Sequence, residues 1–265
     1  MFGENKRKFA RLVSKTKLYK MVGSSTLAIG VMALLISAAP DQSHLQKLSL
    51  DLTARTLFQG KSITAKGAVF YKPTNGLLVT KMFTPLNQII IATATGELKS
   101  YDPQTNKVAL SQGSEFSTKN SFIYSFLSGQ TTDMGLSSSG YKITDTKNDD
   151  GVIVNTWTAP VDRPAPAQFI EIAYENYLPI YLGFKNADGE IIQKTYYTNY
   201  QSVSYIKMPL TITEITYFSE ADSAITQRKY SNLKLNSEVD DTWLDFRIPE
   251  DAEVVDASSM NNAPK

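Results

Sequence analysis

Short runs of alternating apolar and polar residues follow one another along most of this chain. The densest series lies between residues 62 and 102, where Ser62–Tyr71, Leu77–Thr84 and Gln88–Thr95 are each rich in β-branched, aromatic and aliphatic side chains. Proline, asparagine and glycine separate these runs, and such residues favour turns over strands. Runs this short and this closely joined pair only antiparallel, because a parallel crossover needs a dozen residues or more. The pattern therefore predicts that the folded part begins with an antiparallel meander.

The strand pattern continues towards the end of the chain. Tyr141–Asp145 and Val152–Trp157 are predicted to form a hairpin whose loop is centred on residues 148–151, Asn-Asp-Asp-Gly. Further strands are predicted at Lys107–Leu110, Gln168–Tyr174, Pro179–Lys185, Glu190–Thr198, Pro209–Phe218, Ile225–Tyr230 and Trp243–Arg247. The strands then number about eleven, and nearly all of them pair with sequential neighbours.

Two segments depart from the alternation and are predicted to be helices. In residues 41–60, with Gly60 as the stop, leucines recur at intervals of three to five, at Leu45, Leu48, Leu52 and Leu57. In Thr118–Leu127, four apolar side chains would share one helix face, and these are Phe122, Ile123, Phe126 and Leu127. Each apolar face must cover something, most simply the predicted sheet.

Strands that alternate in this way have one buried face and one face in water. A sheet of this kind must close, pack against a second sheet or be covered by helices. We therefore predict a mainly β fold, a curled antiparallel sheet of about eleven strands covered by the two helices. A plain β-sandwich fits the same alternation and stays an alternative.

The first forty residues have a different character. Residues 1–20 contain seven Lys or Arg side chains against a single acidic residue, Glu4. Residues 21–39 carry no charge and match the roughly 20 residues that span a bilayer. By the positive-inside rule the basic segment stays in the cytoplasm, so residues 21–40 are predicted to be a transmembrane anchor or a signal helix.

These two alternatives place the remaining chain differently. An uncleaved single-pass anchor would hold residues 41–256 on the periplasmic side of the inner membrane. A cleaved signal has the same layout, with Ser37-Ala38-Ala39 as a small-residue cleavage site, and would release a soluble periplasmic domain. Residues 257–265 are small and polar and are predicted to be a disordered tail.

Composition and motifs remove several classes of function. The formal charge of +1 gives no reason to expect nucleic acid, and the absence of cysteine excludes disulfides, thiolate metal sites and a lipid-modified N-terminal cysteine. The single histidine, His44, has no visible catalytic partner, and no nucleophile-elbow, dinucleotide-binding or P-loop motif occurs. Trp157 and the many tyrosines would suit a carbohydrate platform, but aromatic residues are ordinary strand formers. We therefore predict no enzymatic activity, no catalytic residue, no metal site and no cofactor.

Several segments, taken in order, carry a family resemblance. The motif G-A-V-F-Y-K-P at residues 67–73 is followed by F-T-P at residues 83–85 and G-E-L-K-S-Y-D-P at residues 96–103. The segments 229–236, 246–249 and 252–255 then close the pattern. Together they resemble the outer-membrane lipoprotein carrier family of the LolA type, over about residues 45–255.

This resemblance implies an unclosed half-barrel with a helical lid and an apolar cavity that takes acyl chains. Where the family has an arginine that helps to hold the lid, this sequence has Lys72, which lacks the planar fork that satisfies several carbonyls at once. Lys72 is the predicted lid contact. From the lid segment and the inward strand faces, the predicted lipid-binding residues are Val69, Met82, Ile90, Phe122, Phe126, Leu127 and Trp157.

Two functions of different classes follow. The first is non-enzymatic binding of lipid or lipoprotein acyl chains at the bacterial cell envelope, with the inner membrane as a second partner through residues 21–39. The second is a membrane-anchored periplasmic scaffold or accessory subunit, which contacts an envelope protein and fills its cavity with its own side chains. A continuous apolar pocket beneath Thr118–Leu127 would favour the first, and a packed core with an exposed apolar patch elsewhere would favour the second.

Overall fold

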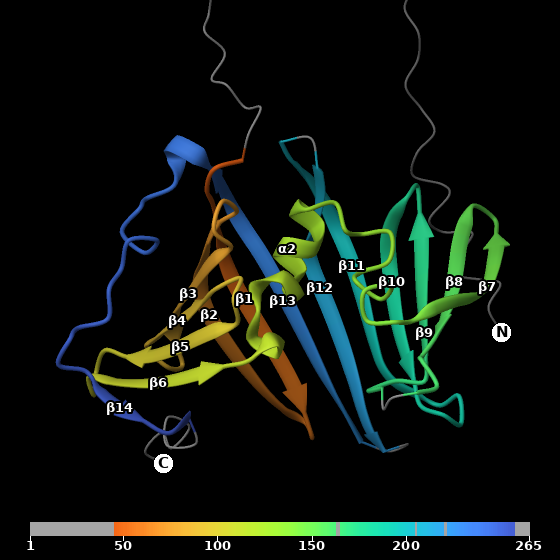
Figure 1. Ribbon diagram of the computed structural model, residues 1–265, viewed down its shortest axis with the longest axis horizontal. Helices are drawn as coiled ribbons and strands as arrows, with labels where there is room; N and C mark the ends of the chain where they lie inside the picture. Colours follow the sequence, from red (N-terminus) through yellow and green to blue (C-terminus); the bar gives the residue numbers. More distant parts are fainter. Residues whose placement is uncertain (1–44, 163–164, 205, 220–221, 258–265) are drawn as a thin grey trace, which may run out of the picture. The chain divides into compact units, whose positions relative to one another are not determined.

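Fourteen strands form a single curled sheet in the part of the chain that the structure describes. The computed structural model in Figure 1 describes residues 45–162, 165–204, 206–219 and 222–257. The order across the sheet is β14-β6-β5-β4-β3-β2-β1-β13-β12-β11-β10-β9-β8-β7. Neighbouring strands run antiparallel, except that β14 pairs parallel with β6 at one edge. The predicted meander and the sequential pairing are therefore confirmed, and within these residues the strands make one sheet instead of the two of a sandwich.

The elements have the following bounds. The first seven strands are β1 (Leu48–Phe58), β2 (Lys61–Lys72), β3 (Leu77–Thr84), β4 (Gln88–Ala92), β5 (Glu97–Asp102), β6 (Lys107–Gln112) and β7 (Lys142–Asp149). The other seven are β8 (Val152–Thr158), β9 (Phe169–Glu175), β10 (Leu178–Lys185), β11 (Ile191–Val203), β12 (Ile206–Ser219), β13 (Asp222–Leu235) and β14 (Glu253–Val255). One α-helix, α2 (Phe122–Leu127), and three 3₁₀ turns, Ser114–Phe116, Thr118–Asn120 and Asn236–Glu238, complete the described elements.

The predicted helix over residues 41–60 is wrong wherever the structure describes it. Residues 48–58 form β1, which pairs with β2 on one side and with β13 on the other. Leu48 and Leu50 lie two apart, so they point to the same face of the strand, and both are almost fully buried. This burial comes from a distant partner strand, which overrides the helix-like spacing of the leucines. Residues 41–44, including His44, lie outside the described residues.

The predicted strand at Trp243–Arg247 is also wrong, because these residues form a turn and a bend and then continue without regular structure. Their apolar side chains belong to a C-terminal strap, which we define as residues 236–252. Trp243, Leu244 and Phe246 pack on the outer face of the sheet against a cluster that includes Phe70 and Val79. The last strand is β14, which follows the strap, and the total is fourteen strands where about eleven were expected.

The membrane segment predicted at residues 21–39 lies outside the described residues, as do residues 258–265 of the predicted tail. In the ranges given above, no helix combines the length and the apolar character needed to cross a membrane. The anchor, the signal helix and the disordered tail therefore stay predictions.

Candidate functional site

One face of the sheet, which we call the inner face, carries the main apolar cluster and α2 packs on it (Figure 1). Phe126 of α2 is fully buried, and its ring lies 5.5 Å from that of Tyr197 and 6.1 Å from that of Tyr200. Phe122, one turn earlier, packs at 4.9 Å from the ring of Tyr230. The inner face beneath α2 is therefore filled by the protein's own side chains.

Three serine and threonine side chains fix the start of this helical cover. Ser121 caps α2 by accepting a hydrogen bond from the Tyr124 N–H at 3.2 Å. Thr118 Oγ1 donates to the Gly76 carbonyl at 2.7 Å, and Ser117 Oγ donates to a main-chain carbonyl in the β4–β5 connection at the same distance. The prediction of a helix over Thr118–Leu127 is confirmed for its second half, while residues 118–120 form a 3₁₀ turn.

A polar loop, which we define as residues 129–141, continues the cover over β8 and β9. Its Met134 and Leu136 are half-buried against the inner cluster. The Tyr174 hydroxyl donates to the Thr132 carbonyl, and Asp133 accepts hydrogen bonds from two N–H groups of the loop, at 3.0 Å and 3.3 Å. The loop thus rests on the apolar side chains of Met134, Leu136 and the buried Tyr141, and it is also shaped by its own hydrogen bonds.

Electrostatics agree with this arrangement. Burial opposes ionisation of Asp133, but the hydrogen bonds from Ser137 and Gly135 outweigh it, so the pKa of this carboxyl is lowered. Burial, with a contribution from the Asp133 carboxylate, raises the pKa of Tyr174. Tyr174 therefore keeps its proton and remains the donor that holds the polar loop.

The seven predicted lipid-binding residues all lie on the inner face or on its helical cover. Val69, Phe126 and Trp157 are buried in the inner cluster, and Phe122 and Leu127 are half-buried against it. Met82 and Ile90 share the inner face by register, because Val69 pairs with Thr80, Thr80 pairs with Ile90, and Gly67 pairs with Met82. Lys72 is the half-buried last residue of β2, opposite Leu77. Whether any of them contacts lipid stays a prediction.

One open pocket lies at the margin of this cover. It has a volume of about 290 Å³, and its walls come from the C-terminal end of α2, the end of β2 and the β11–β12 turn. Leu127 lines it, together with Tyr71 and Tyr124. Of the predicted lipid-binding residues, only Leu127 reaches this opening.

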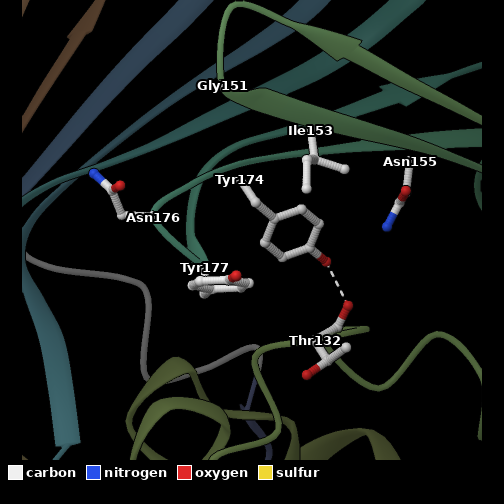
Figure 2. Close-up of a pocket in the computed structure, with 7 residues that line it drawn as sticks. All are labelled: Thr132, Gly151, Ile153, Asn155, Tyr174, Asn176 and Tyr177. Atoms are coloured by element: carbon white, nitrogen blue, oxygen red, sulfur yellow. Dashed lines mark hydrogen bonds between the residues drawn. The ribbon is translucent and has the colours of Figure 1, made fainter.

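Another pocket, which we call the rim pocket, lies beyond the polar loop (Figure 2). It has a volume of about 410 Å³ and is lined by Thr132, Gly151, Ile153, Asn155, Tyr174, Asn176 and Tyr177. This volume falls within the usual range of small-molecule sites. Sequence reasoning missed these residues, although Ile153, Asn155 and the predicted Trp157 alternate along one face of β8, which is a usable signal.

The described residues hold two further features of chemical interest. Trp157 is buried, and its indole N–H has no hydrogen-bond partner among them. Such a donor costs free energy unless a ligand or a water molecule meets it. No group of three or more His, Asp or Glu side chains placed to hold a metal ion occurs in these ranges.

Comparison with known proteins gives results at the level of structure. No family model and no curated protein sequence matches the chain. A DUF1329 family protein from Desulfovibrio piger is similar with a TM-score of 0.55 and 12% identity, over 77% of this chain and 91% of that chain. A domain from Vibrio parahaemolyticus, provisionally assigned to outer membrane lipoprotein sorting, has a TM-score of 0.51 and 11% identity, over 74% and 88% of the two chains. A LolA superfamily protein from Nitrosomonas europaea has a TM-score of 0.49 and 14% identity, over 75% and 90%.

The chain therefore has the fold of the first two of these proteins. The first two likenesses extend over about three quarters of its length, and they confirm the open half-barrel architecture that the LolA-type resemblance implied. At such low identity they show the fold alone.

Proposed function

We propose that this protein binds lipid or lipoprotein acyl chains on the inner face of its sheet, without catalysis, at the bacterial cell envelope. The observation that carries the proposal is the rim pocket, which opens beside the apolar inner face of a curled sheet whose described cover includes the six-residue α2 and the polar loop. A domain of the same fold carries a provisional assignment to lipoprotein sorting, which supports this choice.

The rim pocket is the place where an acyl chain would enter. Ile153 is 38% exposed there, and the Tyr174 ring stands beside it. A chain that advances along β8 from this point would pass Asn155 and reach Trp157 beneath the polar loop. Each buried methylene contributes roughly 0.8 kcal/mol, so a few methylenes suffice to displace the loop's limited apolar contacts.

The test compares the same kind of substitution at two sites, one in the rim pocket and one outside it. Ile153→Asp places a charge in the rim pocket, and Ile63→Asp places one at a site that is 63% exposed. The full-length protein is isolated, and the lipid extracted from it with organic solvent is quantified by mass spectrometry. We expect the first variant to retain about fivefold less lipid or worse, since a charge opposes apolar burial, and the second to match the unaltered protein. Equal lipid in all three proteins would refute the proposal.

A second candidate function rests on a different observation. Near the β1–β2 and β12–β13 turns, Phe58, Ile63 and Phe218 are exposed, and the rings of Phe58 and Phe218 meet edge to face at 5.6 Å. Exposed apolar side chains that gather in this way are typical of a contact surface for another protein. With the filled core beneath α2, this patch favours a membrane-anchored periplasmic scaffold or accessory subunit, and Ile63→Asp would then abolish capture of its partner while lipid content stays unchanged.

A further inference from the structure

The rim pocket also carries information about the polar end of the ligand. We propose that it holds the head group of a neutral, hydroxyl-bearing amphiphile, such as a sugar or glycerol head, while the acyl chain lies on the inner face. This inference rests on the proposed function, since the same ligand would occupy both places.

The first argument is the uncharged lining. The rim pocket is formed by amide, hydroxyl, phenol and aliphatic groups, and none of the residues that line it is charged. The nearest charged neighbours along the chain are carboxylates, because Asp133, Asp150 and Glu175 each adjoin a lining residue. An anionic phosphate or carboxylate head would meet no cation among the described residues that line the pocket and would be repelled by these carboxylates.

The second argument is the orientation of Asn155. Its Oδ1 accepts a hydrogen bond from Thr146 Oγ1 at 3.0 Å, so its amide NH₂ supplies the donors on the pocket side (Figure 2). A quaternary ammonium head would leave these donors without an acceptor. A hydroxyl group both donates and accepts, so a polyol matches the amide and the two phenols.

The third argument is Tyr177, which is 92% exposed and has a φ of 64°. With Asn176 at a φ of 50°, it forms the two-residue turn between β9 and β10. Glycine, asparagine or aspartate normally occupies such positions, because a side chain is strained in the left-handed region. The strained backbone at Tyr177 holds its ring in water beside the Tyr174 ring (Figure 2), where the face of a sugar can stack on it.

The experiment titrates the full chain with three probes that share a twelve-carbon chain: dodecyl maltoside, dodecanoate and dodecyltrimethylammonium. Each is used below its micelle concentration, and bound probe is read by native mass spectrometry. We expect the maltoside to bind about tenfold more tightly than dodecanoate, from one or two extra hydrogen bonds and the avoided repulsion.

Variants test whether the preferred maltoside head group lies in the rim pocket. Tyr177→Asn removes the ring and relieves the turn, so it folds, and it should lower maltoside affinity about fivefold while dodecanoate affinity is unchanged. Asn155→Leu should do the same. Tyr196→Ala, at an exposed tyrosine outside the pocket, is the matched control and should have no effect.

The possible outcomes separate the two proposals. Equal affinity for the three probes, or a preference for either charged head, overturns the head-group inference and leaves acyl-chain binding standing. No binding of any probe overturns the proposed function as well. A maltoside preference that Tyr177→Asn does not reduce also overturns this inference, because the head then lies elsewhere.

Discussion

The two flanks of the sheet are stabilised in different ways. On the β2–β6 flank, the C-terminal strap covers the outer face, and Trp243 packs at 6.4 Å from the ring of Phe70 and at 5.8 Å from that of Phe246. On the β7–β10 flank, the inner face is covered by the polar loop, and the sheet ends in β7, an edge strand whose residues are all exposed. The first flank is clamped by aromatic packing of the strap, whereas the second is covered by a loop that several hydrogen bonds shape, and it carries the rim pocket.

The side chain of Lys81 packs against the C-terminal strap. Lys81 is buried, donates to Asn87 Oδ1, and lies 5.4 Å from the centre of the Trp243 ring. Burial lowers its pKa, and the Asp102 carboxylate offsets part of this shift. A buried ammonium needs partners that replace water, and Asn87 and the Trp243 ring supply them, so we infer that Lys81 ties the strap to the β2–β6 flank. Under the proposed function, ligand exchange then belongs to the other flank, where the rim pocket lies.

The largest expected effect that separates the flanks is loss of stability in alkali. Burial raises the pKa of Tyr181, Tyr197 and Tyr230 to about 12, from 10.0. Their stabilisation is fully present below pH 10 and is lost as the pH rises through 12, because the unfolded chain then releases protons that the folded chain retains. The total is on the order of 5 kcal/mol after allowance for partial exposure.

The two tryptophans report on the flanks separately during such a titration. Trp157 lies on β8, and Trp243 lies in the C-terminal strap. In the Trp243→Phe protein, fluorescence of Trp157 should change at a lower pH than that of Trp243 in the Trp157→Phe protein, since Tyr174 and Tyr181, whose pKa values burial raises, lie on β9 and β10 of the β7–β10 flank. Coincident transitions would show that the sheet responds as one unit and would remove the contrast.

The next effect in size is removal of the aromatic clamp. Trp243→Ala should lower the free energy of unfolding by about 3 kcal/mol, because it removes the ring that packs against Phe70 and the Lys81 side chain. Urea denaturation measures this. Lipid content should be unchanged, and a loss of bound lipid in this variant would contradict the assignment of exchange to the other flank.

The smallest effect is expected for the polar loop. Leu136→Ala should cost about 1 to 2 kcal/mol, since this side chain is only half-buried against the inner cluster. Hydrogen exchange should accelerate in residues 129–141 and stay unchanged in β2–β6, and ligand association should become faster. A destabilisation as large as that of Trp243→Ala would mean that the loop is a structural clamp too.

Local signals explain which elements the sequence predicted well. Leu77–Thr84 matches β3 to the residue, because Gly76 and Pro85 bound it. The β7–β8 turn falls at Asp150 and Gly151, both with positive φ, as the Asn-Asp-Asp-Gly pattern indicates. The inner-face assignment of Val69, Met82 and Ile90 followed from simple alternation, which register preserves.

The failures share a dependence on distant parts of the chain. The leucines of β1 have a spacing that a helix would also satisfy, and pairing with β2 and with the distant β13 decides between the two structures. The apolar pattern around Trp243 and Phe246 is also typical of a strand, and only packing on the outer face of β2–β6 decides their conformation. The rim pocket gathers Thr132, Asn155 and Tyr177 from three separate segments, so the alternation along β8 indicates only its β8 wall.

The pairing of β1 with β13 also determines when this sheet can be completed. Leu48 of β1 pairs with Leu235 of β13. The two halves of the sheet can therefore join only after β13 is available to pair with β1. Contacts of such wide sequence separation slow folding, because a long loop must close before they stabilise anything. A chain that emerges from its N-terminus would show a bare hydrophobic strand edge until nearly all of it had been made. Nascent chains of this protein should therefore depend on a holding chaperone.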